Sequence, residues 1–561
     1  MRNRQTGVLA ALVFLVFCIY SVNKASVRGH RSRAQLNSDS SSSRDAFEKP
    51  SAVSRPEPDP GGSHPVLHLI NHAEREFEAV RARQSRTLRD AVAEYRRRYG
   101  LPPPPHFDKW WALARRRNVQ LVDEFDTIHE LITPFWGLKP ATTRARAREV
   151  LGYDNALLGV QIRGGNVTLM QANPTWMKGN GKYMHESLKA MMQGFVAFLP
   201  DMDLAFNIND EPRVAVPHDD LARLVQTART VNMPAANAAA APRNSFTEKP
   251  SGLNYDGRFD EVRQTRFNVF AHQPVWSHSR VSCPPDSPAR ILEDDEQFDD
   301  ISRYALGELG FVYNWTAMSD ICLSPSLAAT FGFFQRPNAY DVVHDLVPIF
   351  SQSKISSYSD ITYPSPWYYA DKVPYDPSKD PAWSAKLDRL YWRGSTTGGF
   401  SRAGGWRHQH RQRVVQKINA PDLAKILTPT LPDPQQEEQQ PPPPEEQPQQ
   451  WTVRHVPRRD HAALTDVYFS HIGQCDPGDC DAQHEFFAVK AYAAQESALG
   501  FRHVLDLDGN AFSGRFYALL RSRSLVYKWA VFREWHYEWL RPWVHFVPMS
   551  LRGEEWLEAV R

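Results

Sequence analysis

Apolar positions along this chain follow two different periods, and their alternation predicts a mixed α/β fold. From Val66 the segment "VLHLINHAEREFEAVRARQSRTLRDAVAEYRRRYG" spaces its apolar residues as a helix does, and the pattern ends at Gly100. Shorter apolar runs, among them "LAFNI" (204–208) and "VLDL" (504–507), have the length of strands and stop at polar turns. Strands that alternate with helical segments are typical of α/β proteins.

Two apolar runs near the end of the chain predict neighbouring parallel strands. They are "SRSLVYKW" (522–529) and "WVHFVPMS" (543–550), and we expect a helical turn between them. Parallel neighbours need a crossover connection rather than a tight hairpin, and the spacing of these two runs leaves room for one.

The N-terminal residues predict a membrane anchor. Thr6–Val22 is an uncharged run of 17 residues, near the lower limit of the ~20 that span a bilayer. The flank after it has bulky residues where a signal peptidase needs small ones, so we favour an uncleaved anchor over a cleaved signal peptide. Arg2 and Arg4 favour a cytosolic tail, residues 1–5, and a lumenal remainder. A short span suits early secretory membranes, so we expect a single-pass type II protein of the Golgi or endoplasmic reticulum.

Three segments are too polar or too rich in Pro and Ala to build a core. Residues 23–65 are Ser/Pro-rich and predict a disordered stem that ends where the helical pattern begins. Residues 233–242 and 427–450 predict surface insertions, and the second is a Pro/Gln tract that no compact core accommodates.

The length and net charge of the chain limit the number of domains and the kinds of ligand to be expected. With 561 residues the chain is too long for a single core, so we expect two domains of ordinary size. Lys and Arg number 66 against 64 Asp and Glu, a formal net charge of +2, which gives no basic face for a nucleic acid. Recognition of phosphate would then depend on a few placed arginines.

The cysteines are consistent with an oxidising compartment. Cys18 lies in the predicted anchor, which leaves Cys283, Cys322, Cys475 and Cys480. Four cysteines allow three connectivities, and the close spacing in "CDPGDC" favours Cys475–Cys480 and therefore Cys283–Cys322. A four-cysteine zinc site needs two close pairs, and the sequence has one.

Two sequons are candidate glycosylation sites. Asn166 begins "NVT" and Asn314 begins "NWT", both of which fit a lumenal chain.

The stretch "HVLDLDGNAFSGRF" (503–516) carries the strongest candidate chemistry. A calcium loop counted from Asp506 needs Gly at position six and Glu at position twelve, but the chain has Ala511 and Tyr517 there, so that interpretation fails. Asp506 and Asp508 either hold a divalent cation that bridges a diphosphate or serve as satisfied residues at a strand end and turn.

The residues that follow predict an anion site. Ser513, Gly514 and Arg515 open a segment with helical apolar spacing, and backbone amides together with a guanidinium bind phosphates well. The alternative is an ordinary surface arginine. Its place after a buried strand and a Gly-containing turn favours a ligand, because ligands of α/β sheets gather there.

A second such segment is "LYWRGSTTGG" (390–399). Arg393, Gly394 and Ser395 follow an apolar strand and supply a guanidinium, an unobstructed backbone and a hydroxyl. The Gly-Lys-Ser/Thr ending of a P-loop is missing, so this is a phosphate site of another kind.

A candidate base lies far upstream. Asp210 and Glu211 follow the strand at 204–208 and precede Pro212, in a loop where a carboxylate can take a proton from an acceptor hydroxyl. An aspartate that only stabilises the turn is the alternative, and the sequence leaves both open.

Six segments, in order along most of the chain after the stem, together resemble glycosyltransferase family 90, which includes lumenal protein O-glucosyltransferases and capsule-associated xylosyltransferases. The segments are "YRRRYGLPPPPHFDKWW", "LPDMDLAFNINDEPRV", "YSDITYPSPWYY", "LYWRGSTTGG", "LDLDGNAFSGRFYALLRSRSLVYKW" and "EWLRPWVHFVPMSL".

The resemblance implies a GT-B architecture, in which two Rossmann-like domains face each other across a cleft. Residues 66–350 would form the acceptor side and residues 351–561 the side that holds a UDP-sugar. The implied enzyme is an inverting glycosyltransferase that moves xylose or glucose from the UDP-sugar to a hydroxyl of a glycan or protein. It would have no tightly bound cofactor and no required metal, so Asp506 and Asp508 would be structural.

The resemblance also assigns residues. The catalytic base would be Asp210. The donor contacts would be Arg393, Gly394, Ser395, Ser513 and Arg515. The other residues of the cleft would be Glu211, Asp360, Pro366, Trp367 and His545.

Two other functions stay open from the sequence. One is a lumenal binding protein that keeps this fold without turnover. The other is a metal-dependent transferase that uses Asp506 and Asp508, which chelators would inhibit.

Overall fold

The structure is a computed structural model that describes residues 53–57, 59, 62–173, 177, 181–239, 252–292, 298–430 and 450–561. These residues belong to one compact unit, Lys49–Arg561. The predicted anchor at 6–22, most of the stem at 23–65 and most of the tract at 427–450 lie outside the described residues. Within them, no helix has both the length and the apolar character needed to cross a bilayer.

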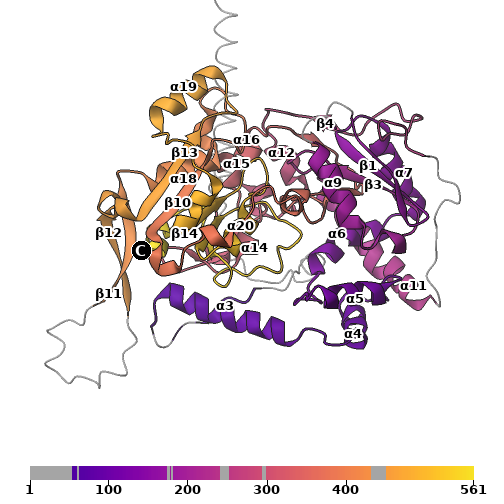
Figure 1. Cartoon of the computed structure of the whole chain (residues 1–561), viewed down its shortest axis with the longest axis horizontal. Coiled ribbons are helices and arrows are strands. Elements are labelled where there is room, and N and C mark those ends of the chain that lie inside the picture. Colours follow the sequence, from indigo (N-terminus) through magenta and orange to yellow (C-terminus); the bar gives the residue numbers. More distant parts are fainter. Residues whose placement is uncertain are drawn as a thin grey trace, which may run out of the picture. The chain divides into compact units, whose positions relative to one another are not determined.

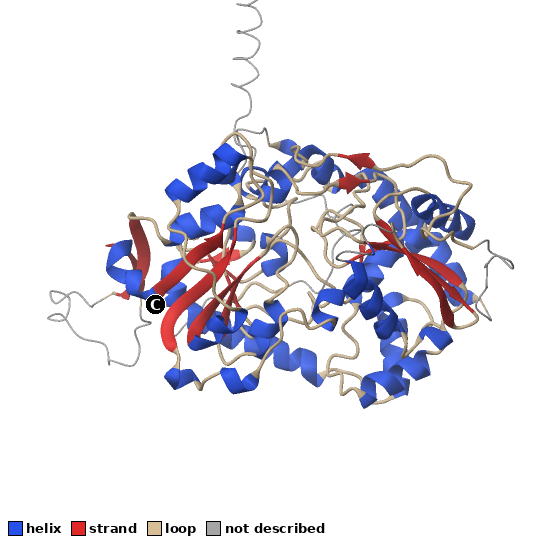
Figure 2. Ribbon diagram, turned by 45° about the horizontal axis from the view of Figure 1, so that its top comes forward, coloured by secondary structure: helices blue, strands red, loops and turns tan. Residues whose placement is uncertain are grey.

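Two five-stranded sheets stand apart, with helices around each of them (Figure 2). The first has the order β2-β1-β3-β8-β9, in which β1 pairs antiparallel with β2 and β3, and β3, β8 and β9 are parallel. Its strands are β1 (Leu157–Arg163), β2 (Asn166–Gln171), β3 (Met202–Asn207), β8 (Ile349–Ser351) and β9 (Ile361–Thr362). The predicted strand at 204–208 is confirmed as β3.

The second sheet is entirely parallel, with the order β13-β10-β14-β15-β16. Its strands are β10 (Leu387–Ser395), β13 (Thr465–His471), β14 (Phe501–Leu507), β15 (Leu525–Trp529) and β16 (Val547–Pro548). From β10 the chain moves to the edge strand β13 and then returns to β14 on the other side of β10. This reversal is a topological switch point, where open α/β sheets usually bind ligands.

The predicted parallel pair near the end of the chain is confirmed as β15 and β16. The connection between them, residues 530–546, consists of turns rather than the expected helical turn. Together the sheets make the mixed α/β fold with parallel strands that the sequence predicts.

Helices and short strand pairs complete the fold (Figure 1). The helices are α3 (Pro65–Ala82), α4 (Leu88–Tyr99), α5 (Phe107–Arg116), α6 (Asp126–Trp136), α7 (Pro140–Gly152), α9 (Gly181–Met192), α10 (His218–Thr227), α11 (Met233–Ala238), α12 (Trp276–Ser279), α13 (Pro288–Ile291), α14 (Trp315–Met318), α15 (Leu327–Thr330), α16 (Gly332–Gln335), α17 (Pro366–Tyr369), α18 (His410–Ile418), α19 (Pro477–Phe486), α20 (Phe516–Arg521) and α21 (Trp556–Val560). The strand pairs are β4 (Asn268–Val269) with β7 (Asp341–Val342), β5 (Ala305–Leu306) with β6 (Phe311–Val312), and β11 (Leu423–Pro429) with β12 (Trp451–Pro457).

The predicted helical stretch from Val66 to Gly100 is two helices, α3 and α4. Thr87 separates them because its hydroxyl accepts from the amide of Asp90 while the Asp90 carboxylate accepts from the amide of Thr87, a capping box. Gly100 ends α4 at φ +62°, a left-handed conformation that glycine adopts without strain.

In both predicted insertions, the first residues belong to regular secondary structure. Residues 233–238 form α11, since alanine favours helix. Residues 427–429 belong to β11, and the Pro/Gln tract joins β11 to its antiparallel partner β12.

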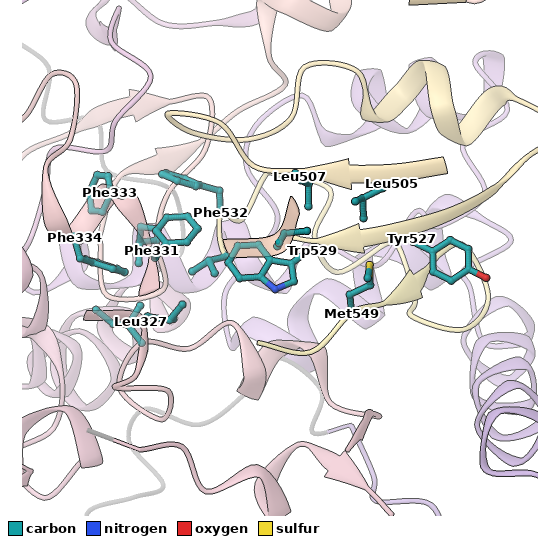
Figure 3. Close-up of a cluster of buried hydrophobic side chains, with 14 of the residues drawn as sticks. Leu327, Phe331, Phe333, Phe334, Leu505, Leu507, Tyr527, Trp529, Phe532 and Met549 are labelled. Carbon is teal, nitrogen blue, oxygen red and sulfur yellow. The ribbon is translucent and has the colours of Figure 1, made fainter. Parts of the chain in front are cut away.

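The hydrophobic core places the boundary between the two halves differently from the prediction. Phe331, from the sequence half assigned to the first domain, stacks on Trp529 of the second sheet with ring centroids 5.8 Å apart, and Phe333 and Phe334 belong to the same buried cluster (Figure 3). The predicted boundary at 350/351 falls inside β8, and the chain enters the second sheet only at Leu387. Apolar residues from the half of the sequence before residue 350 therefore pack against the second sheet.

Both predicted disulfides are present, Cys283–Cys322 and Cys475–Cys480. They are compatible with a secreted or lumenal protein.

The two sequons differ in accessibility. Asn166 is exposed at the start of β2, whereas the Asn314 side chain is half-buried and accepts from the amide of Ala317 as the N-cap of α14.

We expect Phe331→Ala to lower the free energy of unfolding by about 3–5 kcal/mol, the usual cost of truncating a buried Phe. Phe331 is fully buried, and its ring stacks at 4.3 Å on His410. Urea denaturation measures the loss, and Phe298→Ala, at a 64% exposed position, should change stability by less than about 0.5 kcal/mol. Equal effects of the two substitutions would contradict the packing of residues 327–334 on the second sheet.

Candidate functional site

A pocket of about 490 Å³ lies against the second sheet, at the carboxyl ends of β10 and β13. Its wall brings together Arg393, Gly394, Ser395 and Arg515, which are four of the five predicted donor contacts. The other lining residues are Val373, Pro374, Tyr375, Tyr391, Trp392, Ser470, His471, Tyr492, Ala493, Ala494, Gln495, Glu496, Ala498, Leu499, Val504, Leu505, Ala518 and Leu519. This volume is typical of small-molecule sites.

Arg515 has the side chain in this pocket best suited to an anion. Its Nη1 donates to the carbonyl oxygen of Arg393 at 2.7 Å, and no carboxylate of the described residues lies within ion-pair distance. Burial lowers the pKa of Arg515. A guanidinium that is surrounded by protein and lacks a carboxylate partner is stabilised by an anion in the pocket it lines.

Arg393 is already paired. Its Nη2 donates to Asp466 Oδ1 at 2.7 Å and its Nη1 donates to the Asp466 carbonyl oxygen at 2.7 Å. The guanidinium also lies over the rings of Tyr391 and Tyr468. Because β10 runs through Ser395, the three predicted contacts from this segment belong to the strand rather than to a loop after it. Arg393 shapes the pocket and orients Arg515 through its carbonyl oxygen.

The segment with helical spacing predicted after Gly514 is the short helix α20. α20 has six residues, ends at Arg521, and is followed by β15 from Leu525. Ser513 is buried and does not line the pocket; its carbonyl oxygen accepts from the Tyr368 hydroxyl at 2.9 Å. An anion in this pocket would therefore meet the Arg515 side chain rather than a helix N-terminus.

Trp367 holds the segment that carries Arg515. Its indole Nε1 donates to the carbonyl oxygen of Gly514 at 3.0 Å. A Cβ added at Gly514 would lie 2.5 Å from that Nε1, so only glycine fits there. Trp367 also contacts Tyr183 of α9 edge-on, with ring centroids 5.9 Å apart. The predicted cleft residues Pro366 and Trp367 thus connect the pocket with the elements around the first sheet.

Asp210 follows β3 of the first sheet, as predicted, and its side chain is exposed. Burial by the surrounding protein nevertheless raises its pKa. Burial, and then the charge of Asp210, raise the pKa of Tyr183 to about 12, so the two side chains share this region.

Glu211 has a structural partner in the folded chain. It is buried, its Oε1 accepts from the amide of Ala339 at 3.0 Å, and burial raises its pKa to about 8. The side-chain Nδ2 of Asn207 donates to the Glu211 carbonyl oxygen and fixes the loop.

Two further predicted cleft residues also have structural partners. Asp360 is fully buried and accepts from the amides of Arg213 and Val214 and from the Ser351 hydroxyl. The Nδ1 of His545 accepts from the amide of Arg541, and the ring does not line the pocket. Asp360 therefore ties the loop after β3 to β9, and His545 stabilises a local turn.

Asp506 and Asp508 are held by neighbours from the adjacent strand. Asp506 Oδ2 accepts from Lys528 Nζ at 2.6 Å, and Asp508 Oδ2 accepts from the amides of Val531 and Phe532. These contacts favour structural roles for both. In the described part of the chain no three His, Cys, Asp or Glu side chains converge in a way that could hold a metal ion.

The same region carries buried carboxyl groups with raised pKa values. Burial raises the pKa of Asp508 to about 7 and that of Glu534 to about 8, and both side chains are at least 95% buried. The charged and titratable groups facing Glu534 are Lys528, Asp506, Asp508, Tyr368, Tyr517 and His536.

Three residues in or beside the pocket were not among the predicted site residues. Arg411, next to Arg515, is buried and bonds to the ends of β10 and β14. His471 and Tyr492 are exposed residues of the pocket wall. For Arg411, the available signal was the basic run "RHQHRQR" after the Gly-rich turn. No motif marks His471 or Tyr492. Only the folding of β13 and of residues 487–494 brings these two side chains to the pocket.

A comparison with models of protein families and a search of curated proteins found no match to this chain.

We expect the free energy of unfolding of the parent to fall between pH 6.5 and pH 8, and Glu534→Gln to reduce that fall. The folded-state pKa of Glu534, about 8, lies above the usual ~4.3, so its contribution is complete at low pH and is lost as the pH rises through 8. One group changes stability by at most about 1.4 kcal/mol per pH unit. Urea denaturation at pH 6.5 and pH 8 measures this fall in the free energy of unfolding. Glu186→Gln, exposed on α9, should show the same fall as the parent.

Proposed function

We propose that this chain is an inverting glycosyltransferase of the secretory pathway that transfers a sugar from a UDP-sugar to a hydroxyl of a glycan or protein. The observation that carries the proposal is Arg515, a guanidinium with no carboxylate partner among the described residues, in a pocket beside the switch point of a parallel sheet.

The chemistry of the pocket suits a nucleoside diphosphate. Arg515 supplies charge for the diphosphate, and the hydroxyls of Ser395 and Ser470 supply hydrogen bonds. Tyr391 and Tyr492 provide aromatic surface for a base or a sugar ring. A volume of about 490 Å³ suits a ligand of this size.

The proposed base is Asp210. In an inverting transfer the acceptor oxygen attacks the anomeric carbon opposite the departing UDP, and a base removes its proton. Asp210 is exposed, whereas its neighbour Glu211 is buried and bonded to Ala339. The raised pKa of Asp210 makes it a stronger base than a free aspartate. Arg515 would stabilise the charge that develops on the leaving diphosphate, so the proposal includes no metal.

The resemblance to glycosyltransferase family 90 supports the same function. Its motifs supply Asp210 at the first sheet and Arg515 at the second, which agrees with a GT-B arrangement in which acceptor and donor bind to different halves. The two disulfides are compatible with the proposed lumenal side of a Golgi or endoplasmic reticulum membrane.

A binding protein without turnover is the second candidate. The pairing of Arg393 with Asp466 favours it, since this leaves the pocket with fewer arginines for the diphosphate than the resemblance implies. Release of UDP in the presence of an acceptor separates the two functions, and UDP-xylose, UDP-glucose and UDP-glucuronate are the donors to test.

Arg515→Ala should weaken binding of UDP by about 1.5–3 kcal/mol, the contribution of a hydrogen bond to a charged group. Arg515→Lys should recover part of the loss, because it keeps the charge without the planar pair of donors. Isothermal titration calorimetry measures the affinities, with Arg89→Ala on the exposed face of α4 as the control. Parental affinity in Arg515→Ala would move the nucleotide site elsewhere.

Asp210→Asn should reduce sugar transfer by about 10²–10⁴-fold while UDP affinity stays at the parental value. The amide keeps the shape of the side chain but does not accept the proton. UDP-release kinetics measure the transfer, EDTA should change it little, and Asp219→Asn on α10 is the matched control. Transfer at the parental rate would make Asp210 a turn residue; an inactive parent that binds UDP would favour the binding protein.

A further inference from the structure

The turn that follows β10 is fastened to the small loop closed by Cys475–Cys480. Ser401 donates from its amide to the Gln474 carbonyl oxygen at 2.8 Å, and its carbonyl oxygen accepts from the amide of Asp476 at 2.9 Å. The Asp479 carboxylate accepts from the Ser401 hydroxyl at 2.5 Å and from the amide of Gly404 at 2.9 Å. The disulfide ring thus contains two of the residues that hold residues 401–404.

An ion pair adds to this attachment. Arg402 Nε donates to Asp476 Oδ2 at 2.7 Å on the surface. Asp476 and Asp479 keep their positions because the ring, with a sequence separation of only 5 between its cysteines, restricts the backbone at the start of α19. We call residues 475–480 the disulfide loop.

The disulfide loop lies next to the pocket along both strands that end there. Ser395 is the last residue of β10 and precedes the attached turn, and Ser470 and His471 end β13 shortly before Cys475. All three line the pocket. Movement of the disulfide loop relative to the turn would therefore change the spacing of the pocket wall.

The two disulfides differ in their exposure. Cys475 and Cys480 are both partly exposed, whereas Cys283 is fully buried in the main core. Access to the sulfur limits attack by a thiolate, so a reductant should reach Cys475–Cys480 first.

We propose that the Cys475–Cys480 disulfide is a redox-sensitive positioning element of the pocket, and that its reduction loosens residues 396–404 and weakens ligand binding without unfolding the chain. The reductant is a dithiol. It gives two electrons and two protons, the bond between the two Sγ atoms breaks, two thiols form, and the dithiol becomes a disulfide. The effect on the ligand rests on the nucleotide function proposed above, whereas the effect on the turn does not.

The test uses the full-length chain, in detergent, with three variants. Cys475→Ser/Cys480→Ser removes the disulfide. Asp479→Ala keeps it but removes the carboxylate that holds Ser401 and Gly404. Asp481→Ala, at an exposed position two residues further along α19, is the matched control. Hydrogen exchange follows the amides of residues 396–405, and calorimetry with UDP follows the pocket.

We expect the double serine variant and Asp479→Ala to exchange faster at residues 396–405 and to bind UDP about tenfold more weakly, as expected when an ordered contact near a charged site is lost. Exchange in β14 and β15 should stay parental, and so should both measurements for Asp481→Ala. Mild dithiothreitol treatment of the parent should reproduce the effect while mass spectrometry finds Cys283–Cys322 intact.

Three results would overturn the proposal. They are unchanged exchange at residues 396–405 in the double serine variant, faster exchange spread evenly over the chain, and faster exchange at the turn with parental UDP affinity. A parent that binds no UDP would refute the nucleotide function instead, and the exchange measurements alone would then decide the role of the disulfide in positioning the turn.

Discussion

The buried guanidinium of Arg411 holds together the carboxyl ends of the two strands that flank the switch point. Its donors reach the carbonyl oxygens of Ser395, Leu507 and Asp508 and the hydroxyl of Thr397. No carboxylate pairs with it in the described part of the chain. Burial and the neighbouring charge of Arg515 lower its pKa to about 9, so it stays protonated at neutral pH. Strand-end carbonyl groups replace the missing counter-ion, because a buried charge must be hydrogen-bonded.

With the ends of β10 and β14 joined in this way, the turn after β10 has little freedom. Gly398 takes φ +110°, and a Cβ there would lie 2.4 Å from the ring of His410, so the turn requires glycine.

This arrangement explains why Arg515, and neither of the other two arginines, remains available to a ligand. Arg411 uses its donors on the strand ends, and Arg393 is committed to Asp466. Arg515 is oriented by one bond to the Arg393 carbonyl oxygen and supported from behind by the contact of Trp367 with Gly514. A ligand anion would contact the guanidinium of Arg515 directly. The positive charge of Arg411, which lies too deep for contact, would also attract the anion. Positive charge in a site of low dielectric acts over such distances.

The parts of the fold that local pattern determines were predictable from the sequence. Apolar runs gave β3, β14 and the parallel pair β15 and β16, and the pairing of four cysteines followed from spacing.

What depends on long-range packing was not predictable. Residues 327–334 are apolar with no strand alternation, so nothing in the sequence indicates that they cover a sheet whose strands lie between residues 387 and 548. Arg393 and Arg515 occur in similar contexts, a strand end beside glycine, and only the position of Asp466 on the neighbouring strand distinguishes the paired arginine from the free one.

Asp210 and Glu211 show the same limit at the other half of the proposed site. The two carboxylates are adjacent, so composition and spacing treat them alike. In the folded chain the Asn207 amide holds the loop by the Glu211 carbonyl oxygen, which directs the Glu211 side chain inward to the amide of Ala339. Its pKa near 8 would leave it mostly protonated at neutral pH, and a protonated carboxyl accepts no further proton. Asp210, in the bend that precedes Glu211, stays exposed. Its pKa is raised by burial among protein atoms while solvent still reaches the carboxylate. Solvent exposure and a raised pKa coincide at Asp210, in the loop that Glu211 anchors.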